Sequence, residues 1–212
     1  MSRHGGSLTP ENIAQLLQPY VAHVPNPEPG WPHIHAQLAL YLQLILKWNA
    51  RTNLTAIRTP EEIVRRHFGE SLFAGTLLNE CPTLLDFGSG PGFPGLPIQL
   101  LRPEIAVTLA ESQGKKAAFL REAVRTLNLT TEIWPARVEA MPSIRQFHTV
   151  TLRAVDDINA AIAEAAARAS HRVLILTTSR QSAFPVHAEF RQAEPIPLPE
   201  SSNGVLLIAE RL

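Results

Sequence analysis

The segment from Asp86 to Gly92 is the part of the sequence best suited to bind a small molecule. An apolar run ends in the pattern Asp86-x-Gly88-x-Gly90-x-Gly92, and a helix is predicted to begin shortly afterwards. Glycines allow the backbone to turn sharply, to adopt positive φ and to approach a ligand where a Cβ atom would collide with it. The sequence therefore predicts a loop that binds a nucleotide-like cofactor at the end of a strand.

The spacing of these glycines separates two classes of cofactor. Dinucleotide-binding loops follow Gly-x-Gly-x-x-Gly, with a helix N-terminus facing a pyrophosphate. Here Phe93 stands where the third glycine is required, and Pro94 removes one of the N–H donors that a phosphate would use. The loop instead resembles the first motif of class I S-adenosylmethionine (SAM) methyltransferases, whose cofactor carries a cationic sulfonium and no phosphate. Asp86 suits that positive charge, because a buried carboxylate is costly unless something pairs with it.

A second acidic residue is predicted to complete the pocket. Residues 105–110 are typical of a buried parallel strand, and Glu111 closes that strand. Ligands of open α/β sheets bind outside the carboxyl ends of the strands, so Glu111 would lie beside the glycine loop. There its carboxylate can accept hydrogen bonds from both ribose hydroxyls. The alternative is that Glu111 only caps the helix that begins near Gln113.

The composition is that of an ordinary globular protein. The chain has 212 residues, of which 45% are hydrophobic and 18% are charged, which allows one large domain or a domain with an extension. The single cysteine, Cys81, excludes a disulfide framework and a cysteine-based zinc site, and favours a reducing cytoplasm. No apolar run reaches about 18 residues, and the N-terminus lacks an apolar signal core, so we expect neither membrane insertion nor secretion. His33 and His35 have no carboxylate at ligand spacing, so no metal is predicted.

Charge is balanced over the whole chain but uneven along it. The formal net charge is zero, so the overall field does not indicate a nucleic-acid partner, and DNA is not expected. Between residues 47 and 67, however, Trp48 and only two acids, Glu61 and Glu62, accompany a group of fixed cations. These cations are Lys47, Arg51, Arg58, Arg65 and Arg66. Such a patch either holds an RNA backbone or is a solvated helix face.

The order of the predicted elements indicates an α/β fold with a helical extension. Residues 1–79 are predicted to form an N-terminal helical extension, interrupted by a loop over the proline-rich residues 25–32. Residues 80–212 alternate strands and helices, which predicts a mostly parallel, doubly wound sheet of seven strands with one antiparallel edge strand. The expected strands are residues 83–87, 105–110, 131–134, 149–152, 172–176, 188–193 and 205–209, and the expected helices of this region are residues 95–101, 115–127 and 158–169.

Several short motifs occur in the same order and at similar spacing as in one methyltransferase family. They are Trp48-Asn49, Asn53-Leu54-Thr55, Arg66-His67, the loop from Gly88 to Gly95, Glu111-Ser112, Lys115-Lys116, Phe119-Leu120, Arg137-Val138-Glu139 and Arg153-Ala154. From about Leu38 to Leu212 the chain resembles the bacterial 16S ribosomal RNA guanine-N7 methyltransferases called RsmG, formerly GidB. The resemblance implies a Rossmann-like class I methyltransferase core. It also implies an enzyme that uses SAM, releases S-adenosylhomocysteine, and acts on 16S rRNA or the small ribosomal subunit. We expect a cytoplasmic monomer without a metal. The expected target is N7 of one guanine in the decoding region, numbered 527.

The resemblance also assigns functional residues. Cofactor contacts fall on Gly88, Phe93, Val138, Glu139 and Arg153, in addition to Asp86, Gly90, Gly92 and Glu111 from the loop and strand patterns. RNA contacts are expected at Arg51, Asn53, Arg58, Arg65, Arg66, His67 and Arg180.

Three of these assignments have alternatives. Phe93 either closes over the methionyl chain or packs in the core. Glu139 either meets the adenine edge or pairs with Arg137 or Arg145 on the surface. His67 either stacks on or bonds to RNA, or is a satisfied core histidine.

Three positions depart from the family pattern. Leu152-Arg153-Ala154 stands where Ser-Arg-Ala is expected, which keeps the arginine and loses a hydroxyl. Glu70-Ser71 stands where family members usually carry Asp-Ser, and Thr178-Ser179 stands where a Lys-Gly pair is expected, so Arg180 is the candidate replacement cation.

The expected chemistry requires no general base, because guanine N7 has a lone pair and no proton at neutral pH. Holding N7, the methyl carbon and sulfur in line can supply about 7–11 kcal/mol. An arginine that recognises the base, with Arg153 or Arg137 as candidates, must engage O6 or a phosphate and leave N7 bare. Other functions stay open at this point: a SAM-dependent enzyme that acts on a small molecule or another RNA, and an NAD-type oxidoreductase or nucleotide-binding module.

Overall fold

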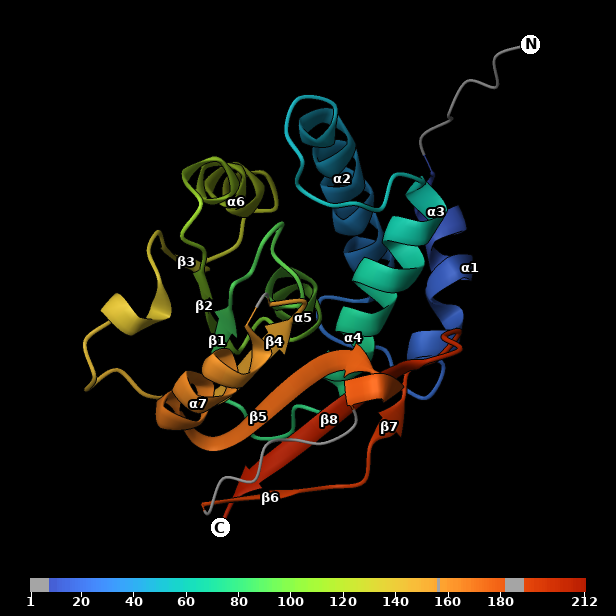
Figure 1. The fold of residues 1–212 in the computed structure, drawn as a ribbon. Coiled ribbons are helices and arrows are strands. Elements are labelled where there is room, and N and C mark those ends of the chain that lie inside the picture. Colours follow the sequence, from blue (N-terminus) through green and yellow to red (C-terminus); the bar gives the residue numbers. More distant parts are fainter. Residues whose placement is uncertain (1–7, 156, 182–188) are drawn as a thin grey trace.

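A central twisted sheet carries helices on its faces, and a group of N-terminal helices lies beside it (Figure 1). The computed structural model describes residues 8–155, 157–181 and 189–212. None of the helices within these ranges combines the length and the apolar character needed to cross a membrane.

The N-terminal region is helical, as predicted. Its elements are α1 (Pro10–Val21), α2 (Trp31–Asn49), α3 (Pro60–Glu62), the π-helix η1 (Ile63–Gly69) and α4 (Glu70–Thr76). α1 begins at a capping box in which the Thr9 side chain accepts a hydrogen bond from the Asn12 N–H. The predicted loop over residues 25–32 was two residues too long, because α2 already includes Trp31 and Pro32. Proline is tolerated in the first turn of a helix, where its missing N–H has no intrahelical partner to lose.

The sheet has the predicted doubly wound topology. Its strands are β1 (Thr83–Phe87), β2 (Ala106–Ala110), β3 (Glu132–Trp134), β4 (Phe147–Arg153), β5 (Ala169–Thr178), β6 (Phe190–Gln192), β7 (Ile196–Pro197) and β8 (Gly204–Arg211). The strand order is β3-β2-β1-β4-β5-β8-β6, with β7 paired to β8. The first five strands pair in parallel, and β8 runs antiparallel to its neighbours. The mostly parallel sheet with an antiparallel strand is thus confirmed. Among the described residues it has eight strands rather than the predicted seven, because the two-residue β7 also pairs with β8, and the antiparallel β8 lies one position inside the edge that β6 forms.

The connecting helices lie close to their predicted positions. They are α5 (Gly95–Leu101), α6 (Gly114–Thr126) and α7 (Ile158–Arg168), together with the short turns η2 (Val138–Ala140) and η3 (Ser179–Gln181). The strand predicted over residues 188–193 is shorter in the structure, where β6 covers Phe190–Gln192, and residue 188 lies outside the described ranges.

The strand register brings the ends of three strands together. Asp86 in β1 lies opposite Leu109 in β2 and Thr151 in β4. Because the strands are parallel, the residues that follow them emerge at one edge of the sheet. Those residues include Gly88 and Glu111.

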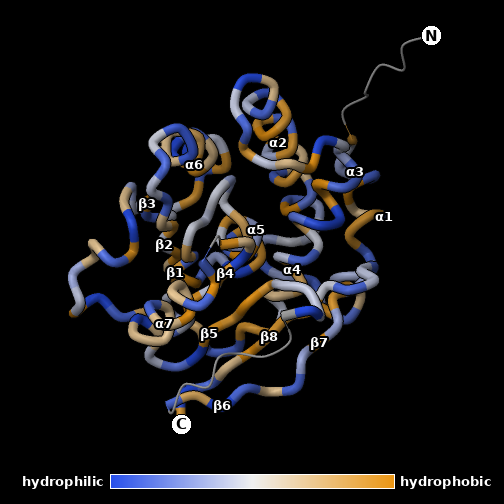
Figure 2. The backbone as a smooth tube through the Cα atoms, viewed as in Figure 1, coloured by the Kyte–Doolittle hydropathy of each residue, from blue (hydrophilic) through white to orange (hydrophobic). Residues whose placement is uncertain are grey.

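The hydrophobic core continues from the sheet into the N-terminal helices. Apolar residues concentrate on the central strands and on the inner faces of the helices (Figure 2). Tyr41 of α2 packs against Phe68 of η1, Phe93 of the glycine loop and Phe119 of α6, with ring centroids 5.3, 5.5 and 6.3 Å away. All four rings are buried. This aromatic cluster joins α2 and η1 to the glycine loop and α6.

Candidate functional site

The glycine loop turns sharply between β1 and α5. Gly88, Gly90 and Gly92 have φ values of 69°, 56° and 95°, a region that residues with a Cβ rarely adopt. A Cβ on Gly92 would lie 2.7 Å from the Tyr41 hydroxyl, and one on Gly95 would lie 2.4 Å from the Leu109 side chain. The loop therefore needs glycine both for its backbone shape and for its close packing.

Asp86 holds the loop from beneath. Its side chain is fully buried, with Oδ2 accepting from the Gly95 N–H at 3.0 Å and Oδ1 accepting from the Thr151 hydroxyl at 3.0 Å. Burial raises the pKa of Asp86 to about 6, against the opposing effect of these hydrogen bonds. Asp86 is absent from the lining of the cavity described below, and its two oxygens are engaged by the protein. Its partners are thus the start of α5 and β4.

Glu111 connects the loop to the end of β2. Its Oε2 accepts from the Gly90 N–H at 2.9 Å, and its Oε1 accepts from the Gln113 N–H at 2.7 Å. The second bond reaches the N–H of Gln113, the residue just before α6, and so lies close to the capping contact considered for Glu111 from the sequence. Each carboxylate oxygen has two lone-pair directions, so both can accept a further hydrogen bond. The two interpretations of Glu111 are therefore compatible.

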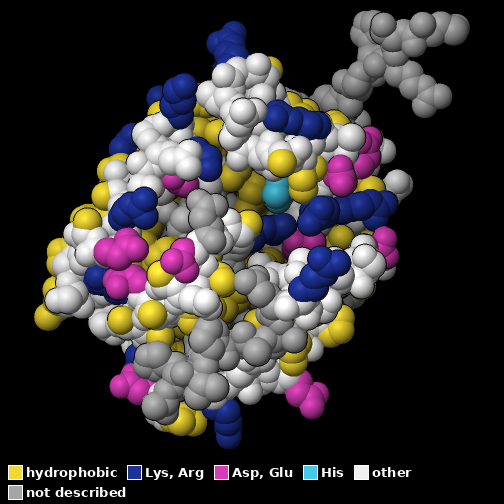
Figure 3. All heavy atoms as spheres, in the orientation of Figure 1, with side chains coloured by type: hydrophobic (Ala, Val, Ile, Leu, Met, Phe, Trp, Pro, Cys, Tyr) yellow, Lys and Arg dark blue, Asp and Glu magenta, His cyan; other side chains and the backbone are white. Residues whose placement is uncertain are grey.

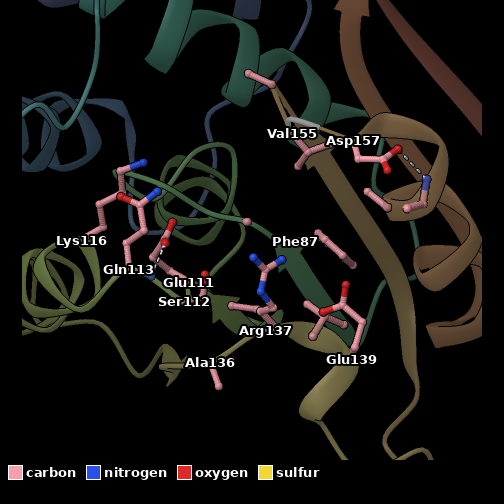
Figure 4. A pocket seen from close by; sticks show the side chains of 16 residues that line it. Phe87, Glu111, Ser112, Gln113, Lys116, Ala136, Arg137, Glu139, Val155 and Asp157 are labelled. Atoms are coloured by element: carbon pink, nitrogen blue, oxygen red, sulfur yellow. Dashed lines mark hydrogen bonds between the residues drawn. The ribbon is translucent and has the colours of Figure 1, made fainter.

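A cavity of about 580 Å³ opens at the carboxyl ends of β1, β2 and β4. This volume is within the usual range for a small-molecule site. The lining includes Gly88, Glu111, Val138 and Glu139, which brings together four of the predicted cofactor residues. In Figure 4 the Arg137 side chain extends into the space between Glu111 and Phe87.

The charges around this cavity suit an adenosyl ligand without phosphates. Three acids, Glu111, Glu139 and Asp157, line it together with Lys116 and Arg137. Glu111 offers acceptors for hydroxyl groups, and the bare backbone at Gly88 leaves room for a flat ligand. These acceptor groups and the open backbone at Gly88 therefore fit SAM. No group of three or more potential metal ligands occurs among the described residues.

Arg153 lies at the end of β4 and reaches away from this cavity towards η1 and α4. Its Nη2 donates to the Arg66 carbonyl and to Glu70 Oε2, both at 2.7 Å. The side chains of Arg153 and Glu70 are only 12% and 8% exposed, and burial raises the pKa of Glu70 while Arg153 opposes that shift. Nη1 of Arg153 is buried and makes no hydrogen bond within the described ranges. Glu70, one of the departures from the family pattern, is thus the ionic partner of Arg153.

Phe93 and His67 stack on each other at the inner end of the N-terminal helices. Their ring centroids are 4.5 Å apart and the rings are nearly parallel. Phe93 is 3% exposed and does not line the cavity, so its contacts are those of core packing. His67 Nε2 bonds to the Thr55 hydroxyl at 2.7 Å, whereas its buried Nδ1 has no partner in the described part of the chain. Burial, followed by the charges of Arg153 and Arg66, lowers the pKa of His67 to about 3, so the ring is neutral at physiological pH.

The predicted RNA residues fall into two groups and one separate position. Arg58 donates to Asn53 Oδ1 at 3.0 Å and to the Asn49 carbonyl, which orders the loop that also carries exposed Arg51. Arg65, Arg66 and His67 share η1, where Arg65 pairs with Glu200 at 3.2 Å. Arg180 is exposed in η3, beyond β5. Figure 3 shows Lys and Arg side chains gathered around a hollow on the face that bears the N-terminal helices and α6.

Two structural contacts to the site were missed from the sequence. The Tyr41 hydroxyl donates to the Pro91 carbonyl in the glycine loop, and Arg168 bonds to the turn that carries Val138. The helical spacing of apolar residues around Tyr41 predicts that its side chain is buried, but it does not identify the group to which the hydroxyl donates. Arg168 ends an alanine-rich helix, where an arginine is ordinarily solvated.

The strand order, the antiparallel β8 and the glycine loop after β1 define a class I SAM-dependent methyltransferase fold. A solved SAM-dependent methyltransferase from Aquifex aeolicus has the same fold, with a TM-score of 0.55 and 15% sequence identity over 71% of this chain and 93% of that chain. The family model described as GidB, rRNA small subunit methyltransferase G, matches residues 34–184. The chain therefore belongs to this family.

Relatives with curated names agree with the family match. The chain is 43% identical over 129 residues to the ribosomal RNA small subunit methyltransferase G of Xanthomonas euvesicatoria, and 45% identical over 123 residues to that of Xylella fastidiosa strain M23. The aligned stretches cover 60% and 58% of this chain and the same shares of the two relatives. The match thus spans less than two thirds of the length of these relatives.

Proposed function

We propose that this protein transfers a methyl group from SAM to N7 of a single guanine in the 16S rRNA of the small ribosomal subunit. The observation that carries the proposal is the cavity at the ends of β1, β2 and β4, which lies within the stretch matched by the rRNA methyltransferase family. When bound, SAM supplies an electrophilic methyl group on a sulfonium. The finer assignment, to guanine 527, rests on the family resemblance alone.

Residues of three segments would hold the cofactor. Gly88 would lie against it, Glu111 would accept hydrogen bonds from the ribose, and Val138 and Glu139 would meet the adenine edge. Asp86, Gly90 and Gly92 would act by fixing the loop, since Asp86 bonds to Gly95 and Glu111 bonds to Gly90. Phe93 would support the loop from its core side.

The side of the site that faces the N-terminal helices would bind the target base. Arg153 and His67 each present a buried polar atom without a partner among the described residues, and an acceptor such as guanine O6 could satisfy the free Arg153 N–H. Arg137 lines the cofactor cavity, which favours Arg153 as the residue that positions the base. Because O6 rather than N7 is engaged, the lone pair of N7 stays free to attack.

The exposed cations would bind the RNA backbone. Arg51, Asn53 and Arg58 of the loop after α2, Arg65 and Arg66 of η1, and Arg180 of η3 are the proposed contacts. A neutral chain with a local basic face fits a folded ribonucleoprotein, which supplies part of the recognition through its shape. We propose that a monomer carries out the reaction.

Labelled methyl transfer tests this function. The protein would be incubated with methyl-labelled SAM and either protein-free 16S rRNA or intact small subunits that lack the modification. We expect label in the RNA, and none when the target guanine is already methylated. A Glu111→Gln variant should bind S-adenosylhomocysteine about tenfold or more weakly, because an amide can accept only at its oxygen. Binding of NAD in place of S-adenosylhomocysteine by calorimetry, or label only in a small molecule, would overturn the proposal.

A further inference from the structure

Arg168 is a buried arginine whose side chain reaches from the last residue of α7 to the η2 turn. The residue is 5% exposed. Its Nη1 donates to the Pro142 carbonyl at 2.7 Å, and its Nη2 donates to the carbonyls of Met141 and Val138 at 2.9 and 3.4 Å. Nε donates to Glu164 Oε1 at 2.7 Å, which compensates the charge within the same helix. All three nitrogens of the guanidinium are therefore engaged.

The turn held by Arg168 forms one wall of the cofactor cavity. Val138 and Glu139 line the cavity, and the segment from residue 138 to residue 145 has only a few backbone hydrogen bonds of its own. These are Ala140 N–H to Arg137 O, Met141 N–H to Val138 O and Arg145 N–H to Pro142 O. Carbonyls at the end of so short a turn lack helical partners and must be satisfied from elsewhere. The planar fork of Arg168 bonds three carbonyls of this segment at fixed relative positions. Those of Val138 and Pro142 also accept from the backbone N–H groups of Met141 and Arg145, so Arg168 adds the donor for Met141 and a second bond at the other two.

The same helix contributes to the opposite side of the cavity. Asp157, Ala160 and Ala161, at the start of α7, line it, and the Asp157 side chain caps the helix by accepting from the Ala160 N–H (Figure 4). α7 thus lines the cavity with its first turn and anchors the facing turn with its last residue.

We propose that Arg168 is a positioning residue for the cofactor: it fixes the Val138–Glu139 wall at the separation from α7 that the adenosyl group requires. This inference rests on the proposed function in that it takes the cavity to hold SAM. Arg168 acts through the main chain of the turn and does not touch the ligand.

Arg211 of β8 provides a matched control. It also donates to carbonyls at the C-terminal end of α7, with Nη2 2.8 Å from Ala166 O and Nε 3.1 Å from Ala169 O, and it pairs with Glu189. Neither Arg211 nor these partners line the cavity. A change at Arg211 therefore removes a similar set of bonds without altering the η2 turn.

The test compares Arg168→Met with Arg211→Met by calorimetric titration of S-adenosylhomocysteine and by thermal unfolding. We expect Arg168→Met to raise the Kd by about tenfold or more, and Arg211→Met to leave it within about twofold, while both variants lower Tm. Arg168→Lys, which keeps one donor to the carbonyls, should fall between wild type and Arg168→Met. In methyl transfer, KM for SAM should rise at Arg168→Met while kcat at saturating SAM stays near that of wild type.

Two results would overturn the inference. One is an unchanged Kd for Arg168→Met, and the other is an equal loss of affinity in both methionine variants, which would indicate a general effect of loosening α7. If Arg168→Met does not fold, Arg168→Lys and Glu164→Gln give the same comparison, and an unchanged Kd in both contradicts the inference. Failure of the proposed function would look different, because wild-type protein would then bind no S-adenosylhomocysteine.

Discussion

Removal of a single oxygen atom tests whether the N-terminal helices support the glycine loop. Tyr41 is fully buried in α2, and its hydroxyl donates to the Pro91 carbonyl. Tyr41→Phe keeps the ring contacts with Phe68 and Phe93 but leaves that carbonyl without its partner. A lost hydrogen bond and a partly buried unsatisfied carbonyl together cost about 1–2 kcal/mol. We therefore expect the free energy of unfolding to fall by about that amount.

Urea unfolding measures this change, and Tyr20→Phe is the control. Tyr20 of α1 is also buried, at 1% exposed, but its hydroxyl makes no hydrogen bond to the residues that the structure describes. Removal of this hydroxyl should therefore change the free energy of unfolding by less than about 0.5 kcal/mol. We propose that residues 1–79 and 80–212 unfold in one transition, because the aromatic cluster spans both. S-adenosylhomocysteine should also bind more weakly to Tyr41→Phe, since Pro91 and Gly92 lose a fixed position. Equal effects of the two substitutions, with unchanged ligand affinity, would refute this reasoning.

Two further outcomes concern the polar groups beside the loop. Glu70→Gln leaves the Arg153 guanidinium buried without its carboxylate partner and should lower the free energy of unfolding by about 3–5 kcal/mol. Glu70→Asp keeps a carboxylate, so urea unfolding should show a smaller decrease in the free energy of unfolding for this variant. The pKa of His67 is lowered to about 3 by burial, below its value of about 6.5 in the unfolded chain, so the unfolded state binds a proton first as pH falls. As the pH falls from 6 to 4, the free energy of unfolding of wild type should therefore decrease relative to that of His67→Gln by up to about 1.4 kcal/mol for each pH unit. If the curves of unfolding free energy against pH are parallel for the two proteins, His67 does not titrate in this way.

The sheet and its glycine loop were largely predictable from the sequence. β1 and α5 have the predicted bounds, because Pro82 and the glycines after Phe87 mark the ends of the strand and Pro94 marks the start of the helix. Glu111 was placed correctly at the end of β2, since a buried apolar run that ends in an acid is a local signal. Local patterns therefore sufficed for elements whose limits are set by backbone chemistry.

Contacts between distant segments were not predictable in the same way. The bond from Tyr41 to Pro91 joins residues 50 positions apart, and the Arg153 side chain turns away from the cavity because Glu70 and the Arg66 carbonyl lie on its other side. Asp86 was expected to suit a cationic ligand, and nothing in the sequence indicated that its two oxygens bond to Gly95 and Thr151; its role towards the cofactor stays a prediction. Each of these outcomes depends on which elements pack against one another, and residue types alone do not specify that.

The most direct measurement is nucleoside mass spectrometry of small-subunit rRNA after reaction with the protein and SAM. The RNA would come from cells that lack the modification, and a digest of the reacted RNA would be compared with one from a reaction without protein. We predict one 7-methylguanosine for each 16S rRNA, located at a single guanine of the decoding region and absent when S-adenosylhomocysteine is in excess. Unmethylated rRNA in the presence of folded protein that binds S-adenosylhomocysteine, or a methyl group on another atom of the base, would contradict the proposed reaction.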